Sequence, residues 1–333
     1  MRITQEMLLK VAEDAVTRRV DEQPEIIAAY LYGSVLEGEP VLGGAADIDL
    51  VYIYAEKQEH REVLRLTADV HLDIHHHGRA LYEPARVLRT DPRWGAALYA
   101  CRALYDPQHF IDFTQAGVRG MYASFDNVWG RAYPLLQAAR QTWMDFHNHP
   151  PELGRQQVWD YLGALENIVN AVSFLSGGRL GERRLLEAFP AKAEAIGQPG
   201  LYFGLLGLLG AGQVDPGRIR AWVPDWQAAY ERGARQPDAP VALHEDRLAY
   251  YLRAVETFLE GERPQDALWP LLRTWTLAVM QLPSNARDIQ TWTEACEQLG
   301  LTGEGFTQRF EALDAFLEMV EEYFEEWKSK EAG

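Results

Sequence analysis

Residues 31–54, LYGSVLEGEPVLGGAADIDLVYIY, place a Gly-Ser pair after one apolar segment and an Asp-x-Asp at the start of the next. Asp is disfavoured inside strands, and the alternation of a strand sends residues i and i+2 to the same face. Asp47 and Asp49 should therefore point the same way, where like charges repel unless a cation lies between them. The pair indicates a cation site at the beginning of a strand.

The segments around this stretch predict a small sheet. Residues 3–16 repeat apolar side chains at helical spacing, whereas 26–32 and 48–54 are short runs of β-forming residues. Residues 69–75, DVHLDIH, alternate apolar and polar side chains, which predicts a half-buried strand with one polar face. Asp73 on that polar face is a third carboxylate, and we expect the sheet to bring it to the other two.

The remainder of the chain has the pattern of helices. From Gly78 the apolar period becomes helical and stays so through GAALYACRALY at 95–105, and Pro- and Gly-rich segments then interrupt a mainly helical sequence at 147–154, 197–200 and 232–241. We therefore expect an α+β fold, in which an N-terminal domain with a small mixed sheet flanked by helices spans residues 1–115. A large all-α region should follow over 116–333, with a subdivision near 233–241.

Charge and composition restrict the class of protein. Acidic residues outnumber basic ones by 49 to 32, a net charge of −17, so a nucleic-acid substrate is disfavoured and a small cationic one is favoured. The alternative is that the acidic surface only provides solubility. Two cysteines, no signal-peptide pattern and no apolar run long enough for a bilayer predict a cytoplasmic protein without a membrane segment.

Gly33 and Ser34 stand between a predicted strand and VLEG, a plausible helix start. Such a junction offers backbone N–H groups and a hydroxyl to phosphate oxygens. Glycine also lets a phosphate approach the main chain, because no Cβ blocks it. A Gly-Ser pair alone is an ordinary turn, so the phosphate interpretation depends on the carboxylates that follow it.

The combined pattern resembles the signature of the polymerase-β-type nucleotidyltransferase superfamily, in particular its small-molecule, antibiotic-modifying branch. An apolar-Gly-Ser is followed, after the spacer 35–46, by Asp-apolar-Asp-apolar, and CRALYDP at 101–107 is similar to the segment that closes the catalytic domain of small-molecule members. The resemblance covers roughly residues 25–110. It implies the nucleotidyltransferase fold, Mg²⁺ as cofactor and ATP as the nucleotide donor.

The resemblance also implies roles for individual residues. Gly33 and Ser34 would bind the triphosphate, Asp47 and Asp49 would bind the metal ions, and Asp73 would complete the metal site or activate the attacking hydroxyl. Carboxylate oxygens suit Mg²⁺, and two such ions can neutralise a triphosphate while orienting the acceptor. The spacer between Ser34 and Asp47 departs from the family in having no basic residue beside the phosphates.

The run His75–His77 raises the alternative of a zinc site. Alternate side chains of a strand face opposite ways, so three consecutive histidines cannot converge on one ion. We expect His75 to share a face with Asp73, and His76 to point away from it. A polar strand end is the favoured interpretation.

The helical region is expected to bind the acceptor. Glu166, Asn170 and Ser173 follow one edge of an apolar helical stripe, either as a solvated flank or as a polar line facing a cleft, with Glu166 orienting or deprotonating the acceptor. A helix followed by SGGRLGERR loosely resembles antibiotic nucleotidyltransferases, in which a basic residue after such a turn reaches the triphosphate. Arg183 or Arg184 would take that role, with surface solvation as the alternative.

The sequence therefore predicts an adenylyltransferase. It would move AMP from ATP to a hydroxyl of a small acceptor, with a cationic acceptor of the aminoglycoside kind favoured, and release pyrophosphate. The alternatives are a protein- or tRNA-modifying enzyme of the toxin–antitoxin type, and a nucleotide-binding sensor without turnover. Three mutually repelling acids argue against the sensor, because a site without catalysis has no need of them.

Overall fold

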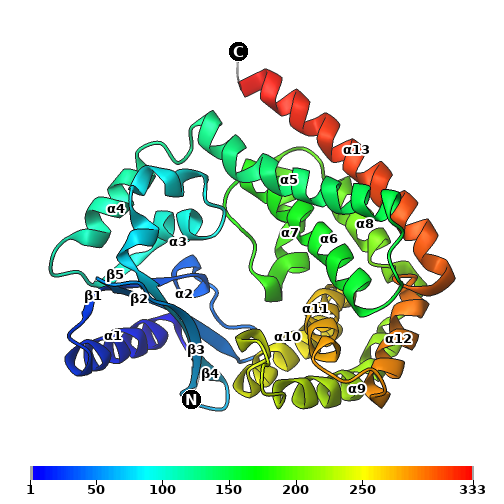
Figure 1. Cartoon of the computed structure of the whole chain (residues 1–333), viewed down its shortest axis with the longest axis horizontal. Coiled ribbons are helices and arrows are strands. Elements are labelled where there is room, and N and C mark those ends of the chain that lie inside the picture. Colours follow the sequence, from blue (N-terminus) through cyan, green and yellow to red (C-terminus); the bar gives the residue numbers. More distant parts are fainter. Residues whose placement is uncertain (1–2, 332–333) are drawn as a thin grey trace. The chain divides into compact units, whose positions relative to one another are not determined.

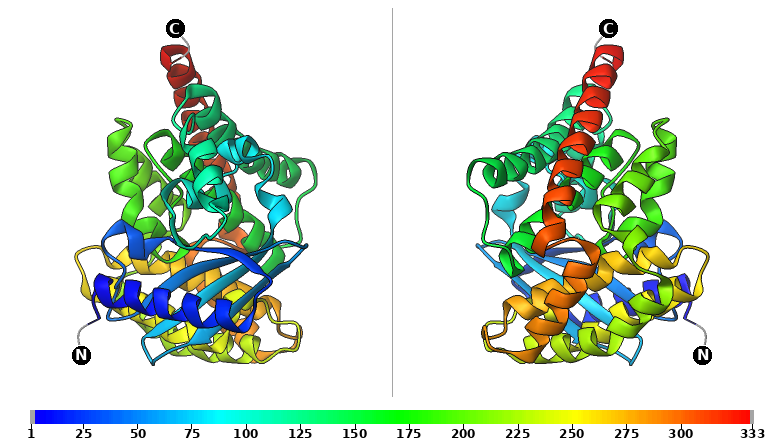
Figure 2. Two further views of the ribbon diagram at one scale, coloured as in Figure 1. Left: turned by 90° about the vertical axis from the view of Figure 1, so that its left-hand side faces the viewer. Right: turned by 90° about the vertical axis from the view of Figure 1, so that its right-hand side faces the viewer.

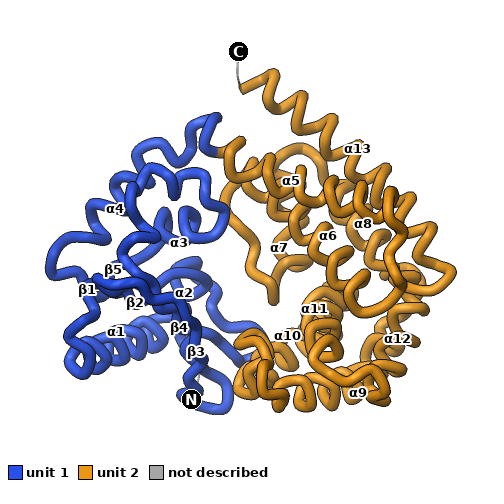
Figure 3. Tube along the Cα trace, in the orientation of Figure 1, with its two compact units in different colours: residues 1–127 blue, residues 128–333 orange. Residues whose placement is uncertain are grey.

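The computed structural model describes residues 3–331 and divides into two compact units, residues 1–127 and 128–333 (Figure 3). The boundary at residue 115 that the sequence suggests falls inside helix α4 (Phe110–Arg119), and α4 packs into a core of the first unit. The first unit therefore contains the whole sheet together with the helices that cover it.

The first unit is built on a five-stranded sheet with the strand order β3-β4-β2-β1-β5 (Figure 1). Its strands are β1 (Ile26–Tyr32), β2 (Ala46–Tyr54), β3 (Glu59–Arg65), β4 (Val70–Gly78) and β5 (Arg102–Tyr105). Strands β2 and β4 run parallel and the other neighbouring pairs run antiparallel, so the sheet is mixed. The predicted α+β class, with a small sheet before a long helical region, is confirmed.

Helices cover both faces of this sheet. Helix α1 (Gln5–Glu22) crosses one face (Figure 2), where Leu8, Ala12 and Val16 pack with apolar residues of β1, β2 and β4. Helices α3 (Trp94–Ala100) and α4 supply the core on the other face, which includes the later part of β2 at Val51 and Ile53. By alternation, Asp47 and Asp49 share that second face and precede its apolar part.

The structure corrects two of the local predictions and adds one strand. Strand β4 is buried along all nine residues rather than on one face, because it is an interior strand between β3 and β2. Strand β3 was not predicted from the sequence. Its residues EHREVLR have the charged composition of an exposed edge strand and little apolar alternation. Residues 102–105 are not helical, because the backbone becomes extended at Cys101 and pairs with β1 as β5.

The second unit is helical throughout the residues that the structure describes. Its α-helices are α5 (Phe125–Asn148), which begins at the unit boundary, α6 (Arg155–Leu175), α7 (Leu185–Ala195), α8 (Gly200–Leu208), α9 (Pro216–Ala234), α10 (Leu248–Glu260), α11 (Leu268–Met280), α12 (Arg287–Leu299) and α13 (Phe306–Glu331). The three predicted helix-breaking segments are confirmed, because they lie at the gaps α5–α6, α7–α8 and α9–α10.

Large aromatic side chains fill the core of the second unit. Trp226 of α9 and Trp292 of α12 are buried and donate their indole N–H groups to Thr274 and Thr276 of α11, at 2.9 and 3.1 Å. The α9–α11 bond spans the predicted subdivision near 233–241. Over residues 3–331, no helix has the length and apolar character needed to cross a bilayer.

Candidate functional site

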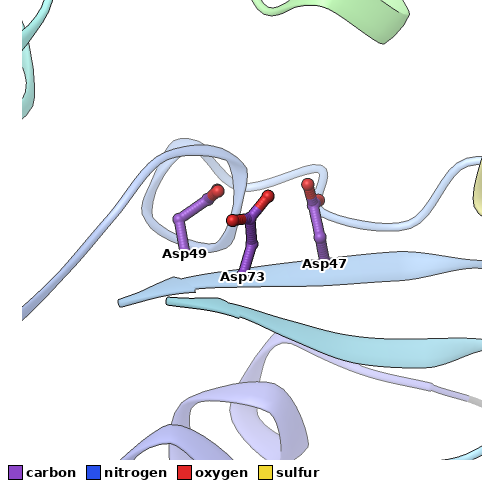
Figure 4. Close-up of side chains that lie close together, drawn as sticks. All are labelled: Asp47, Asp49 and Asp73. Carbon is purple, nitrogen blue, oxygen red and sulfur yellow. The ribbon is translucent and has the colours of Figure 1, made fainter. Parts of the chain in front are cut away.

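Three carboxylates converge on one small volume at the sheet surface (Figure 4). Asp47 and Asp49 lie on β2 and Asp73 lies on β4, where the parallel register pairs Asp49 directly with Asp73. One carboxylate oxygen from each residue lies within 4.8 Å of the others. Asp47 and Asp73 are only 6% and 2% exposed, so much of this negative charge is removed from water. Such a cluster is stabilised by a bound cation.

Gly33 shapes the wall of the site next to Asp49. Its φ is +76°, in the region that favours glycine, and a Cβ at this position would lie 2.3 Å from Asp49 Oδ2. The junction between β1 and helix α2 (Ser34–Glu37) therefore presses its backbone against the carboxylate. A residue with a side chain at position 33 would have to displace Asp49.

Ser34 contributes a buried hydroxyl that no group of the described residues satisfies. Its Oγ is inaccessible to water and makes no hydrogen bond. An unsatisfied buried polar atom is costly, and it is commonly explained by a ligand or ion that completes the hydrogen bond. Helix α2 has only four residues, so its dipole is small, and the hydroxyl and the Gly33 backbone are what this junction offers to a ligand.

Arg61 of β3 reaches the same site and holds Asp73. Its Nε donates to Asp73 Oδ1 at 2.6 Å, and its Nη2 donates to Asp73 Oδ2 in a second bond that completes a two-pronged ion pair. The sequence analysis did not identify this residue. Arg61 lies beside Asp73 because β3 pairs with β4, and EHREVLR has too little apolar alternation to indicate that strand from the sequence.

Aromatic and basic side chains surround the carboxylates. Burial raises the pKa of the Tyr32 hydroxyl well above its ordinary value, and the charges of Asp49 and Asp73 raise it further, while Arg93 and Arg61 oppose them. Burial, followed by the charge of Arg61, lowers the pKa of His75 to about 3, so this imidazole is neutral at physiological pH. The immediate surroundings of the three acids therefore include two guanidinium groups and a neutral histidine.

The three consecutive histidines do not form a metal site. His76 turns to the α1 face, where Nδ1 lies 2.8 Å from the Tyr54 hydroxyl and Nε2 lies 3.0 Å from Glu62 Oε1. His77 bonds the Tyr82 hydroxyl at 2.6 Å on the opposite face. The predicted alternation of these side chains is confirmed, and the one metal-binding group found among the described residues is the aspartate triad.

Glu166 on α6 is held by two guanidinium groups. Its Oε1 accepts from Arg179 and its Oε2 accepts from Arg273, both at 3.0 Å. Arg273 in turn stacks over the Trp159 ring at 3.9 Å. Both carboxylate oxygens are thus engaged, an arrangement that favours a fixed counter-charge over proton abstraction.

Asn170 and Ser173 are buried rather than exposed on a solvated flank. Asn170 Oδ1 accepts from the backbone N–H of Leu180 at 2.9 Å, and Ser173 Oγ donates to the Gly178 carbonyl at 2.5 Å. These two side chains tie the end of α6 to the following turn. Their spacing along the helix reflects this structural role.

Arg183 and Arg184, the predicted triphosphate contacts, both lie in the second unit. Arg183 is 4% exposed and its guanidinium lies 3.5 Å from the centre of the Tyr250 ring. Arg184 donates to Glu187 Oε2 at 2.7 Å. Arg183 is therefore a packed core residue rather than a solvated surface cation.

The donor set of the first unit suits a hard divalent cation and a phosphate ligand. Three carboxylates provide oxygen ligands of the kind that Mg²⁺ prefers, and the Ser34 hydroxyl and Gly33 backbone offer adjacent polar contacts. Comparison of the chain with protein-family models and with curated protein sequences finds no match.

Proposed function

We propose that this protein is a Mg²⁺-dependent nucleotidyltransferase of the polymerase-β type, which transfers AMP from ATP to a hydroxyl of a small acceptor and releases pyrophosphate. The observation that carries the proposal is the convergence of Asp47, Asp49 and Asp73 beside the Gly33–Ser34 junction, whose backbone leaves no room for a Cβ. The order of strand, Gly-Ser, single-turn helix and acidic strand supports assignment of the nucleotidyltransferase fold to the first unit.

Each residue of the site has a role in this reaction. Asp47, Asp49 and Asp73 would bind the Mg²⁺ ions, which neutralise charge on the triphosphate and orient it when bound. The Ser34 hydroxyl and the Gly33 backbone would contact phosphate oxygens. The acceptor oxygen attacks the α-phosphorus, the bond from that phosphorus to the pyrophosphate oxygen breaks, and the pyrophosphate leaves with the bonding electron pair. An Asp73 carboxylate oxygen takes the hydroxyl proton.

Asp73 is a better candidate than Glu166 for the proton acceptor. It belongs to the carboxylate cluster beside the Gly33–Ser34 junction, whereas Glu166 belongs to the second unit. Because both oxygens of Glu166 accept hydrogen bonds from arginines, we assign this residue no part in proton transfer. The net charge of −17 and the long helical unit support a cationic acceptor of the aminoglycoside class.

The test is transfer of label from α-³²P ATP in the presence of Mg²⁺, with aminoglycosides, lincosamides, bulk tRNA and a protein lysate offered separately. Label on a small molecule, absent with Asp49→Asn, is the expected result. Label on tRNA or protein would instead support the toxin–antitoxin type of enzyme. No transfer to any acceptor, with Mg·ATP still bound, would contradict the proposal and indicate a nucleotide sensor.

A further inference from the structure

Arg61 and Asp73 form an ion pair whose two members differ sharply in exposure. The Asp73 side chain is 2% exposed, whereas that of Arg61 is 26% exposed and comes from the edge strand β3. The pair engages both oxygens of the carboxylate. Asp73 therefore cannot present a free oxygen to a metal ion on this side while the pair is intact.

Separation of the pair has an unequal cost for the two residues. A buried carboxylate without a counter-ion is strongly disfavoured, so Asp73 can release Arg61 only if another cation replaces it. The guanidinium, being partly exposed, can turn to a new partner at lower cost. Its planar fork matches a phosphate as well as a carboxylate.

The surroundings supply a reason for such an exchange. The spacer from Ser34 to Asp47 has no basic residue, so a triphosphate at the junction needs positive partners from other parts of the chain. Arg61 is bonded to Asp73, one of the three carboxylates that converge beside the Gly33–Ser34 junction, so its guanidinium lies at the site. Arg61 is therefore a cation already positioned where the phosphates are expected.

We propose, resting on the proposed function, that Arg61 is a positioning residue that exchanges partners, holding Asp73 before substrate binds and pairing with the triphosphate once a divalent ion takes its place at Asp73. Divalent ion and nucleotide then bind cooperatively. The ion alone must displace Arg61 with no phosphate to receive it, and the nucleotide alone must draw Arg61 away from Asp73 with no ion to take its place. Binding of each ligand therefore lowers the free-energy cost of binding the other.

The test measures binding rather than turnover. Mn²⁺ binding to the full-length protein would be followed by electron paramagnetic resonance, and binding of α,β-methylene-ATP by calorimetry with and without Mn²⁺. In Arg61→Gln, Mn²⁺ alone should bind about tenfold more tightly than in wild type, because no guanidinium competes for Asp73. The nucleotide analogue with Mn²⁺ should bind about tenfold more weakly, because one phosphate contact is lost.

Two control variants separate the exchange from simpler effects. Arg61→Lys keeps the charge but loses the two-pronged bond, so both shifts should be smaller and have the same signs. Arg79→Gln removes an equal charge from a surface pair with Glu83 and should change neither affinity. Thermal unfolding monitored by circular dichroism would verify that each variant is folded.

The opposing signs of the two shifts are decisive. If Arg61→Gln weakens both Mn²⁺ and nucleotide binding, Arg61 only holds Asp73 in place, and the exchange is overturned. If neither affinity changes, Arg61 takes no part and the exchange is also overturned. A different result, in which Asp49→Asn binds Mn²⁺ and the analogue as wild type does, would contradict the proposed function itself.

Discussion

At Gly33 the chain has space for a hydrogen atom and nothing larger, because the Asp49 carboxylate occupies the position of a Cβ. The residue also has a φ of +76°, which side chains rarely adopt. These two requirements are independent, one of conformation and one of contact. A substitution at this position should therefore have a larger effect on the site than on the fold.

Gly33→Ala should destabilise the protein by about 1–3 kcal/mol through backbone strain and should also weaken Mn²⁺ binding by displacing Asp49. Urea unfolding and Mn²⁺ titration measure the two effects. Gly38→Ala is the matched control, since Gly38 has a φ of +98° but no atom lies within 4 Å of its Cβ position. Gly38→Ala should lower the free energy of unfolding through backbone strain and leave Mn²⁺ affinity unchanged. An equal loss of Mn²⁺ affinity in both variants would contradict the role given to the contact between position 33 and Asp49.

Replacement of Asp47 or Asp49 by Asn should abolish AMP transfer without unfolding the protein. Each substitution removes one charge from a repelling cluster, so the free energy of unfolding should stay within about 1 kcal/mol of wild type or rise. Label transfer and urea unfolding check the two statements, with Asp14→Asn on the exposed side of α1 as the control. Transfer at the wild-type rate by either variant would end the assignment of a metal ligand.

At the scale of elements, the local sequence was sufficient to predict some strands and insufficient for others. Strands β1 and β2 were predicted because both consist of apolar, β-forming residues, and the approach of Asp47, Asp49 and Asp73 could be expected from Asp-x-Asp and a third strand acid. The edge strand β3 carries charges instead of a pattern, so Arg61 could not be placed beside Asp73. Residues 102–105 have helix-forming neighbours, and only their pairing with β1 makes them a strand.

Strand β4 should make stability depend on pH. Burial, then the charge of Arg93, lowers the pKa of His77 to about 4 from an ordinary value of 6.5, so between these values the unfolded chain binds a proton that the folded chain does not. Stability should therefore fall as the pH decreases through this window, with a slope of up to about 1.4 kcal/mol per pH unit from this residue. His77→Gln should reduce the slope.

Unfolding free energies from urea titrations between pH 4.5 and 7.5 would test the effect of His77. His149→Gln, which removes an exposed histidine of the second unit, is the control. An equal slope in wild type and His77→Gln would show that another group carries the pH dependence.

The end of α6 provides a prediction for the second unit. Asn170→Ala should destabilise the protein by about 1–3 kcal/mol, because it leaves the buried N–H of Leu180 without its acceptor. Asn167→Ala, at a half-buried position of the same helix, should have a smaller effect. Equal values for the two variants, measured by urea unfolding, would contradict the structural role given to Asn170.

For the whole molecule, the order of a sheet-containing part and a helical part was predictable, because the apolar period changes from two to helical after Gly78 and Pro- and Gly-rich segments mark the helix ends. The hydrogen-bond and stacking partners of the polar side chains were not predictable from the sequence. Glu166 and Arg273 are separated by more than a hundred residues of sequence, and no local pattern links them. Arg183 and Tyr250 also lie far apart in the sequence, and no local pattern links them either.

The two cysteines are buried, Cys101 in the first unit and Cys296 in the second, and burial raises the pKa of both thiols, that of Cys101 to about 12. A thiol reagent can therefore react only when the surrounding structure opens. Each unit thus contains one internal reporter of its own opening, without any engineered label. If the nucleotide site lies in the first unit, Mn²⁺ with α,β-methylene-ATP should slow the modification of Cys101 more than that of Cys296, and mass spectrometry of each cysteine-containing peptide over time would measure both rates.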